Sequence, residues 1–275
     1  METKLSIIIP SLNETYYLPK VLRSIKKQKF NDMEVIVVNA GKYAAIRKIG
    51  KKFKVRVVDC EIDSHGPAFA RNVGADAAHG EILLFLDADV ILPENFLKKA
   101  IEEFEERCLG IAGVYARPDS NKIFDEMFWQ FYNLIIFAMK ILRPEASGFC
   151  LFCRKDIHDQ IKGFDREITY REDADYTTRA AKYARYGVLK IPILISVRRF
   201  VKEGRVRLLL KYIVLSAKGM FHKIKKDVGY TFGDYTGKIT RHVKKHAKRI
   251  YKKSIDVSKK VYRRSIKTTK EIANA

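Results

Sequence analysis

The chain has 275 residues, 47% of them hydrophobic, which suits one large domain with or without an appendage and excludes disorder over most of its length. It carries 54 Lys and Arg against 32 Asp and Glu, a formal net charge of +22. A charge of this size implies an anionic partner: nucleic acid, acidic lipid or a phosphorylated small molecule. The four cysteines are too few for a disulfide framework at this length.

The first half of the chain alternates between two kinds of pattern. Short apolar runs predict strands at residues 5–9, 34–38, 55–58, 82–86 and 111–115. Helical periodicity predicts helices at residues 18–29, in a stretch that ends at residue 53, and at residues 68–79 and 94–108. The apolar runs do not alternate with polar residues, so they predict an α/β fold with a mostly parallel sheet and helices on both faces.

The second half is less regular. Its patterns predict helices at residues 122–142 and 173–186, and strands at residues 149–153 and 188–197. The first strand contains a CxxC spacing without a second Cys or His pair, which favours small apolar residues on a buried strand over zinc. One stripe of the first helix is apolar, and we expect it to pack on the core beside an acceptor site, although an exposed apolar surface would suit a lipid-linked acceptor. The stripe consists of Phe124, Phe128, Phe131, Ile135, Met139 and Leu142.

The last part of the chain is basic and helical in pattern. We divide the chain into a domain of residues 1–203 and a C-terminal extension of residues 204–275, with a last helix at residues 239–272. Residues 238–275 contain 14 Lys and Arg against two acids, around a narrow apolar stripe. This pattern predicts an amphipathic helix on an anionic membrane surface. The alternatives are a helix packed on the domain and RNA binding, which no recognised module supports.

The expected location follows from two further features. The N-terminal residues lack a long apolar signal segment, and the longest uncharged run of the aromatic region, residues 127–139, is too short to span a bilayer. We therefore expect a cytoplasmic protein without transmembrane helices. Through its basic extension it would be peripheral on the cytoplasmic face of the membrane.

Two carboxylates, Asp87 and Asp89, directly follow the predicted strand at residues 82–86, in the stretch "EILLFLDADV". Ligands of such sheets lie beyond the carboxyl ends of the strands. Carboxylates one residue apart can bind one Mg²⁺ or Mn²⁺ ion, whose shell is completed by substrate phosphates. The alternative is a solvated loop, because Asp-x-Asp is common by chance.

Three blocks of the sequence resemble family-2 glycosyltransferases, in particular membrane-associated bacterial and archaeal members. The segment "GPAFARNVGADAAHGEILLFLDADV" resembles the family's G-x-A-x-A-R-N-x-G, A-x-G-E and D-A-D pattern. The matching positions are Gly66, Ala68, Ala70, Arg71, Asn72, Gly74, Ala78, Gly80, Glu81, Asp87 and Asp89. The segment "SIIIPSLNETYYLPKVLRSIKKQ" resembles the first strand and nucleotide loop, and "GFDREITYREDADYTTRAAKY" the acceptor-side motif.

The resemblance implies a GT-A fold and an inverting transfer of a sugar from a nucleotide-diphosphate sugar. Asp87 and Asp89 would hold the Mn²⁺ or Mg²⁺ ion that neutralises the leaving diphosphate. Asp173 would match the general base that takes the proton of the acceptor hydroxyl, with Glu172 beside it. The alternative for this acidic pair is a helix N-terminus, where acids are favoured anyway, and both interpretations can hold together.

The resemblance also implies contacts to the donor. Pro10, Leu12 and Glu14 lie in the nucleotide loop, and Arg71 matches a position near the base and phosphate. Of the basic pair that follows the last predicted strand, Arg198 and Arg199, one could reach the diphosphate. Two positions of the predicted donor site depart from the family pattern. Asn39 stands where an Asp contacts the base, and Leu12 stands where an aromatic residue is frequent.

Two other functions compete with this one. A sugar nucleotidyltransferase shares a related sheet and metal use, but it needs a Gly-rich, Arg/Lys-containing signature after the first strand, which "PSLNET" lacks. A basic membrane- or nucleic-acid-binding protein on an inactive transferase scaffold would show no metal-dependent nucleotide binding. We therefore expect a metal-dependent glycosyltransferase, with the sugar, nucleotide and acceptor left open.

Overall fold

The computed structural model describes residues 3–198 apart from residues 62–66, 143 and 169–170. Arg199 and the basic extension of residues 204–275 with its predicted helix lie outside the described residues. The predicted domain boundary at residue 203 lies outside them too.

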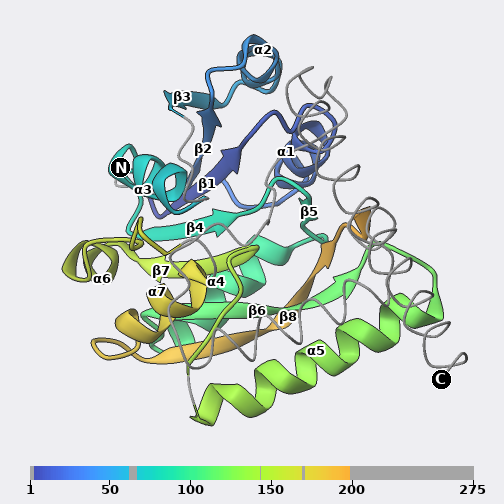
Figure 1. The fold of residues 1–275 in the computed structure, drawn as a ribbon, viewed down its shortest axis with the longest axis vertical. Coiled ribbons are helices and arrows are strands. Elements are labelled where there is room, and N and C mark those ends of the chain that lie inside the picture. The colour runs from blue at the N-terminus through green and yellow to red at the C-terminus, as the bar shows by residue number, and fades with distance from the viewer. Residues whose placement is uncertain (1–2, 62–66, 143, 169–170, 199–275) are drawn as a thin grey trace, which may run out of the picture. The chain divides into compact units, whose positions relative to one another are not determined.

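A sheet of eight strands forms the centre of the described residues, in the order β3-β2-β1-β4-β7-β6-β8-β5 (Figure 1). The strands are β1 (Leu5–Ser11), β2 (Met33–Ala40), β3 (Arg56–Cys60), β4 (Ile82–Leu86), β5 (Val90–Ile91), β6 (Ile111–Pro118), β7 (Cys150–Arg154) and β8 (Tyr186–Ile195). Strands β3, β2, β1 and β4 are parallel to one another, as are β6 and β8. Strand β7 is antiparallel to β4 and β6, and β5 is antiparallel to β8. The predicted α/β fold with a mostly parallel sheet is confirmed.

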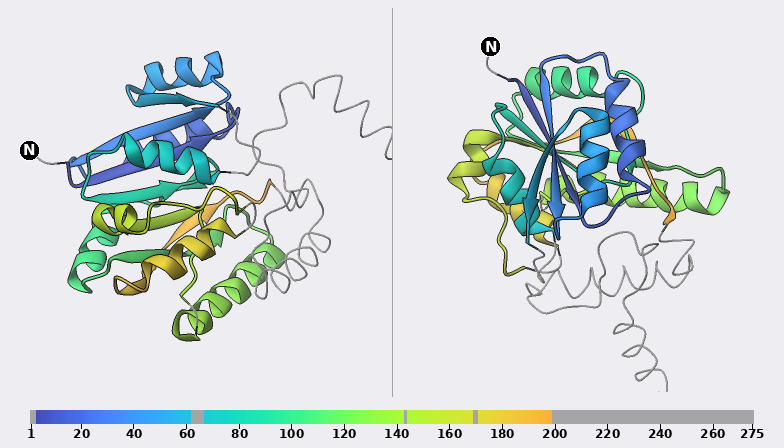
Figure 2. Two further views of the ribbon diagram at one scale, coloured as in Figure 1. Left: turned by 60° about the vertical axis from the view of Figure 1, so that its left-hand side comes forward. Right: turned by 90° about the horizontal axis from the view of Figure 1, so that it is seen from above.

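Helices cover both faces of this sheet, as predicted. They are α1 (Leu18–Lys26), α2 (Ala44–Phe53), α3 (Ala68–Asp76), α4 (Phe96–Glu106), α5 (Ile123–Leu142), α6 (Lys155–Gln160) and α7 (Glu172–Ala180). Apolar side chains of α1, α2 and α4 share one core with Ile7 and Ile9 of β1, whereas those of α3, α6 and α7 share a second core with Ile8. Figure 2 shows the two groups of helices on opposite sides of the sheet.

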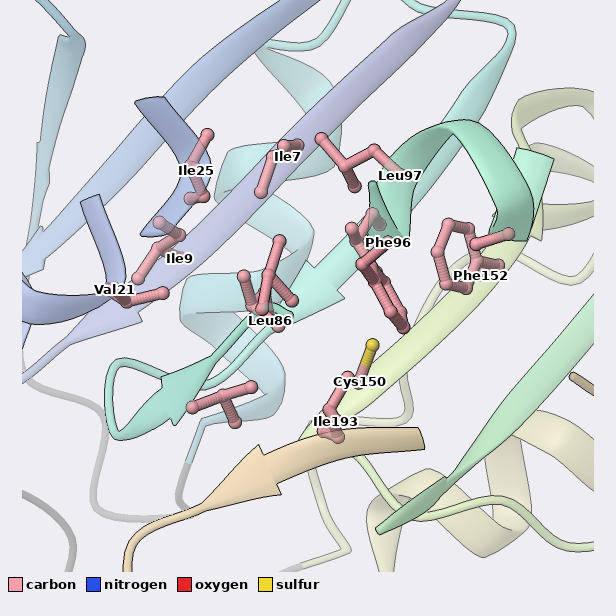
Figure 3. Packing of buried hydrophobic residues seen from close by; sticks show 14 of the residues in the cluster. Ile7, Ile9, Val21, Ile25, Leu86, Phe96, Leu97, Cys150, Phe152 and Ile193 are labelled. Carbon is pink, nitrogen blue, oxygen red and sulfur yellow. The ribbon is translucent and has the colours of Figure 1, made fainter. Parts of the chain in front are cut away.

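The first of these cores supports the end of β4. Leu86, the last residue of this strand, is fully buried and lies among Ile9, Val21 and Phe96 (Figure 3). The strand itself, "ILLFL", is buried at every position. The two carboxylates that follow Leu86 therefore start from a rigid strand.

Some elements differ from the pattern-based prediction. Strand β5 and helix α6 were not predicted, because two and six residues are too few to show a period. The predicted helix at residues 173–186 ends at Ala180, and the following strand begins at Tyr186. Tyr186 pairs with Ile111 of β6, so strand pairing overrides the helical propensity of the preceding residues.

Helix α5 presents a different side from the one we expected. The predicted apolar stripe faces outward at Phe124 and Phe131, which are 41% and 58% exposed. Asp125 is buried instead, and Asn133 binds β6. The helix is apolar nearly all round, so its periodicity did not indicate the buried side. In the part of the chain that the structure describes, no helix combines the length and hydropathy needed to cross a bilayer.

Candidate functional site

The loop after β4 carries Asp87 and Asp89 and is fixed by backbone hydrogen bonds to two other strands. The N–H of Asp87 donates to the carbonyl of Phe149, just before β7, at 3.0 Å. The N–H of Ser196, just after β8, donates to the carbonyl of Asp89 at 3.2 Å. Both carboxylates thus lie where the ends of three strands meet. This agrees with the strand-end rule, by which ligands of such sheets lie beyond the carboxyl ends of the strands.

Arg71, on α3, is a buried cation that links this loop to α7. Its side chain is 3% exposed. Nη1 donates to Oε1 of Glu172 at 2.7 Å, and Nη2 donates to Oδ1 of Asp87 and to the carbonyl of Gly148, both at 3.2 Å. Burial alone disfavours the charged guanidinium, but the carboxylates of Asp87 and Glu172 raise the pKa of Arg71 above its ordinary value. Arg71 therefore holds two acids of the site, and its role as a donor contact stays a prediction.

Asp173 lies in the first turn of α7 and is oriented by two backbone donors. The N–H of Gly148 donates to its Oδ2 at 2.6 Å, and the N–H of Ala174 donates to its Oδ1 at 2.8 Å. Arg171, the residue before this helix, has a φ of 63°, which turns the chain sharply into the helix. Gly148 thus contacts both the candidate base and Arg71, and it connects Asp173 to the acidic loop.

Gly148 is a site residue that no sequence motif indicated. A Cβ atom at this position would lie 2.6 Å from Nη2 of Arg71, so only glycine permits the close approach of this guanidinium. Its place immediately before the strand predicted at residues 149–153 was the sole signal available in the sequence. This glycine lets the backbone approach both side chains, so that its carbonyl accepts from Arg71 and its N–H donates to Asp173.

Glu172 has an unusual environment for an acid. Its side chain is 9% exposed, and its partner is Arg71. Burial, followed by the neighbouring carboxylate of Asp173, raises the pKa of Glu172 to about 7, against the opposing effect of Arg71. We assign Glu172 to the support of Arg71 and of the first turn of α7, beside the candidate base.

Arg198 forms a second network around Asp89. Its Nη1 and Nη2 donate to the two carboxylate oxygens of Glu14 at 2.8 and 2.9 Å, and its Nε lies 2.8 Å from Oδ2 of Asp89. The guanidinium also lies over the ring of Tyr17, 4.5 Å from its centroid. Although burial acts against the charge, Glu14 and Asp89 raise the pKa of Arg198 above its ordinary value. The described structure thus joins Arg198 to a predicted metal ligand and to the nucleotide loop.

The nucleotide loop follows β1 at the same edge of the sheet. Pro10 and Leu12 are partly exposed there, whereas Glu14 is buried against Arg198. The position of these residues at the carboxyl end of a parallel strand agrees with the predicted donor site, but no contact tests their roles.

Asn39 ends β2 and has partners within the protein. Its Oδ1 accepts from the N–H of Tyr43 at 3.0 Å, and its Nδ2 donates to Oδ1 of Asp59 at 2.7 Å. Asn39 is fully buried and carries no charge, so the carboxylate here belongs to Asp59, which is exposed and also binds Arg47. Asp59 follows the strand predicted at residues 55–58, and the strand-end rule applied to Asp87 would have found it. The described contacts do not join this group to the Arg71 network.

The chemistry of Asp87 and Asp89 fits a divalent ion that also binds its substrate. Carboxylate oxygens are the ligands that Mg²⁺ and Mn²⁺ prefer. In the described ranges no group of three or more His, Cys, Asp or Glu side chains could hold a metal by itself. Two protein ligands suit an ion whose remaining ligands are water and phosphate oxygens.

Comparison with known proteins gives a consistent result. The model of the family described as "Glycosyl transferase family 2" matches residues 6–162. Glycosyltransferase AglE of Haloferax volcanii is 26% identical over 184 residues, which cover 64% of this chain and 60% of AglE. The poly(ribitol-phosphate) beta-N-acetylglucosaminyltransferase TarS of Staphylococcus aureus is 31% identical over 189 residues, which cover 64% of this chain and 32% of TarS. The chain therefore spans less than two thirds of the length of these relatives.

Solved structures confirm the fold. The mannosyltransferase PcManGT of Pyrobaculum calidifontis, in complex with GDP-Man and Mn²⁺, aligns with a TM-score of 0.63 at 21% identity and covers 81% of this chain and 66% of that protein. TarS 1-349 in complex with UDP-GlcNAc aligns with a TM-score of 0.57 at 23% identity, covering 71% and 59% of the two chains. The described part of the chain thus has the predicted GT-A fold.

Proposed function

Because the chain belongs to glycosyl transferase family 2, we propose that it transfers a sugar from a nucleotide-diphosphate sugar to an acceptor hydroxyl, with inversion at the anomeric carbon. Pro10, Asn39 and Asp87 lie near the carboxyl ends of β1, β2 and β4, which supports a donor site at this edge of the sheet. Solved proteins of similar fold hold UDP-GlcNAc or GDP-Man, which supports a nucleotide-sugar donor here.

One observation carries the proposal: Arg71 and Gly148 connect the acidic loop to the candidate base. Arg71 binds Asp87, and Gly148 binds both Arg71 and Asp173. A donor diphosphate held at Asp87 and an acceptor held at Asp173 would therefore lie side by side. Such proximity is the main requirement for a displacement that needs no enzyme nucleophile.

Asp173 would act as the general base. The acceptor hydroxyl gives its proton to this carboxylate while its oxygen forms a bond to the anomeric carbon. The bond between that carbon and the diphosphate oxygen breaks on the opposite face, and the nucleoside diphosphate leaves. The N–H groups of Gly148 and Ala174 fix the orientation of the carboxylate before the reaction.

Asp87 and Asp89 would hold a Mn²⁺ or Mg²⁺ ion, which when bound neutralises charge on the leaving diphosphate. Arg198 would release Asp89 or share it, and with Arg199 it is a candidate for direct contact with the diphosphate. Pro10, Leu12, Glu14, Asn39 and Arg71 complete the proposed donor site. The Mn²⁺ bound to PcManGT supports this use of a divalent ion.

We further propose a peripheral position on the cytoplasmic face of a membrane and a lipid-linked acceptor. The support is the basic composition of residues 238–275, with 14 Lys and Arg against two acids. The outward apolar side of α5 agrees with a hydrophobic acceptor.

A thermal-shift panel tests the enzymatic function. UDP-, GDP-, CDP- and dTDP-sugars are compared with and without Mn²⁺. We expect one donor class to raise the unfolding temperature, and a chelator to abolish the shift, because only the folded state binds the ligand. Stabilisation by no donor under any condition would favour an inactive scaffold.

A further inference from the structure

The outward side of α5 gathers most of the exposed large hydrophobic side chains. Of the eight that the described residues contain, six belong to this one helix and are between 41% and 79% exposed. They are Ile123, Phe124, Met127, Phe131, Leu134 and Phe137, which we call the α5 face. The other two, Tyr16 and Tyr183, lie elsewhere in the sequence. A cluster of this kind marks an interaction surface.

The α5 face is continuous and contains a single polar side chain. At 100° per residue its six members lie within about 140° of the helix circumference and extend along about 20 Å. Gln130 is the polar residue within this arc that is exposed. Another side of the helix packs on the sheet, because Asn133 binds both backbone groups of Ala116 at 3.0 and 2.8 Å. The α5 face is therefore not a part of the core.

The last described strand, β8, ends against the segment that leads into α5. The N–H of Asp119, four residues before this helix, donates to the carbonyl of Ile195 at 2.8 Å. Three residues later the described chain ends at Arg198. Residues 199–275, which follow, contain 23 Lys and Arg against five Asp and Glu, or +18 of the total +22. The strongly basic part of the sequence thus follows a residue that is three positions from the contact with the segment before α5.

We propose that the α5 face inserts into the interfacial region of an anionic lipid bilayer. An apolar face with aromatic side chains, in a chain that also carries a strongly basic segment, is the combination that binds such interfaces. A second copy of the chain is a poorer occupant, because it would bring two segments of charge +18 together. This inference deepens the membrane position proposed above, since it names the surface that meets the lipid.

The same helix connects the bilayer to the candidate site. On its inner side, the hydroxyl of Tyr132 hydrogen-bonds to Ser147, and the ring of Trp129 packs edge-on against Phe149, 6.2 Å between centroids. Ser147 and Phe149 flank Gly148, which binds the candidate base Asp173. One helix therefore contacts both the proposed bilayer, through its outer side, and the segment that binds Asp173, through its inner side.

Vesicle sedimentation tests the proposal with the full chain and without donor or acceptor. The vesicles contain phosphatidylcholine alone, or phosphatidylcholine with phosphatidylglycerol. The test variant is Met127→Gln/Phe131→Gln, and the matched control is Tyr183→Gln, an aromatic residue that is 57% exposed outside α5. We expect the test variant to lose at least about tenfold in partition onto the anionic vesicles and the control to change less than about twofold. Equal binding by the test variant and the wild type would overturn the proposal.

A second measurement separates insertion from attraction by the basic segment. Phe131→Trp adds an indole to a chain with a single Trp, and vesicles with a quencher on the lipid chain report its depth. We expect stronger quenching than in the wild type. Binding without added quenching, or a wild type that is dimeric and becomes monomeric in the test variant, would contradict insertion. Because no transfer is measured, failure here is distinct from failure of the proposed activity.

Discussion

Two arginines decide how the acids of the site are held. Arg71 binds Asp87 and Glu172, and Arg198 binds Asp89 and Glu14. Each guanidinium offsets the repulsion between carboxylates that would otherwise raise the cost of gathering them in a partly buried place. The two networks meet in the loop that carries Asp87 and Asp89, so a ligand at this loop affects both.

The Arg198–Glu14 pair predicts a measurable coupling. Arg198→Gln leaves Glu14, whose side chain is 5% exposed, without its bidentate partner. We expect a double-mutant cycle with Glu14→Gln, followed by urea unfolding, to give a coupling of about 1–3 kcal/mol. Arg198→Lys keeps the positive charge but cannot make the bidentate contact of the guanidinium, so this variant should retain only part of the coupling free energy. A coupling near zero would show that the pair does not stabilise the fold.

At the residue scale, the sequence predicted where the acidic residues of the site lie but not which residues they and their neighbours contact. The sequence pattern put Asp87 and Asp89 directly after the strand at residues 82–86, and they follow β4 in the structure. It could not show that Asn39 is buried against Tyr43, because such partners come from another element. Gly148 had no motif, because its importance rests on a close approach in space to Arg71.

At the element scale, the two sides of helix α5 have different surroundings. Its inner side contacts β6 and the segment around Gly148, whereas its outer side is apolar and exposed. A helix held so firmly on one side can present the other side to a partner without loss of position. The site and the proposed bilayer contact thus share one support.

The contact of Asn133 with β6 predicts a large effect on stability. Asn133→Ala removes the amide that binds the N–H and carbonyl of the buried Ala116. We expect urea unfolding to show a loss of about 2–4 kcal/mol, because two buried polar groups lose their partner. The control Gln130→Ala, on the exposed side of the same helix, should change stability by less than about 0.5 kcal/mol. Equal effects of the two variants would contradict the assigned orientation of α5.

Most elements could be predicted from the sequence, but their direction could not. The apolar runs at residues 82–86 and 111–115 predicted β4 and β6, yet β7 lies between them and antiparallel to both. Strand direction depends on the path of the chain between strands, which periodicity does not contain. The prediction of which side of α5 is buried failed for a related reason, because a helix that is apolar nearly all round shows no single side as the buried one.

At the scale of the whole molecule, charge is divided unequally along the chain. Residues 1–198 carry +4 of the net charge, and residues 199–275 carry +18. The fold that holds the candidate site is thus close to neutral, and the attraction to anionic partners comes chiefly from the C-terminal part of the sequence.

Stability should also depend on pH through His158. Burial, aided by Lys155 and Arg179 and opposed by Asp159, lowers the pKa of His158 from 6.5 to about 4, and its ring also contacts the hydroxyl of Tyr176. The unfolded chain takes up the proton near pH 6.5 and the folded protein does not, so stability is lost as the pH falls from 6.5 towards 4.

Urea unfolding across this range measures the effect of His158. We expect the stability difference between the wild type and His158→Gln to change by up to about 3 kcal/mol. The control Gln130→Ala replaces an exposed side chain on α5 that carries no titratable group, and it should show no such change. The same pH dependence in all three proteins would exclude His158 as the cause.

The most direct test of the account is the transfer rate of Asp173→Asn, measured in a single turnover beside donor binding by the same preparation. The amide oxygen of Asn can still accept from the N–H of Gly148, its NH2 group cannot accept from the N–H of Ala174, and the side chain can no longer take up a proton. Asp159→Asn, whose side chain is 61% exposed on α6, is the control. We predict a loss of at least about a hundredfold in transfer with donor affinity nearly unchanged. Transfer at a near-normal rate would contradict the role of Asp173 and the joined site built around it.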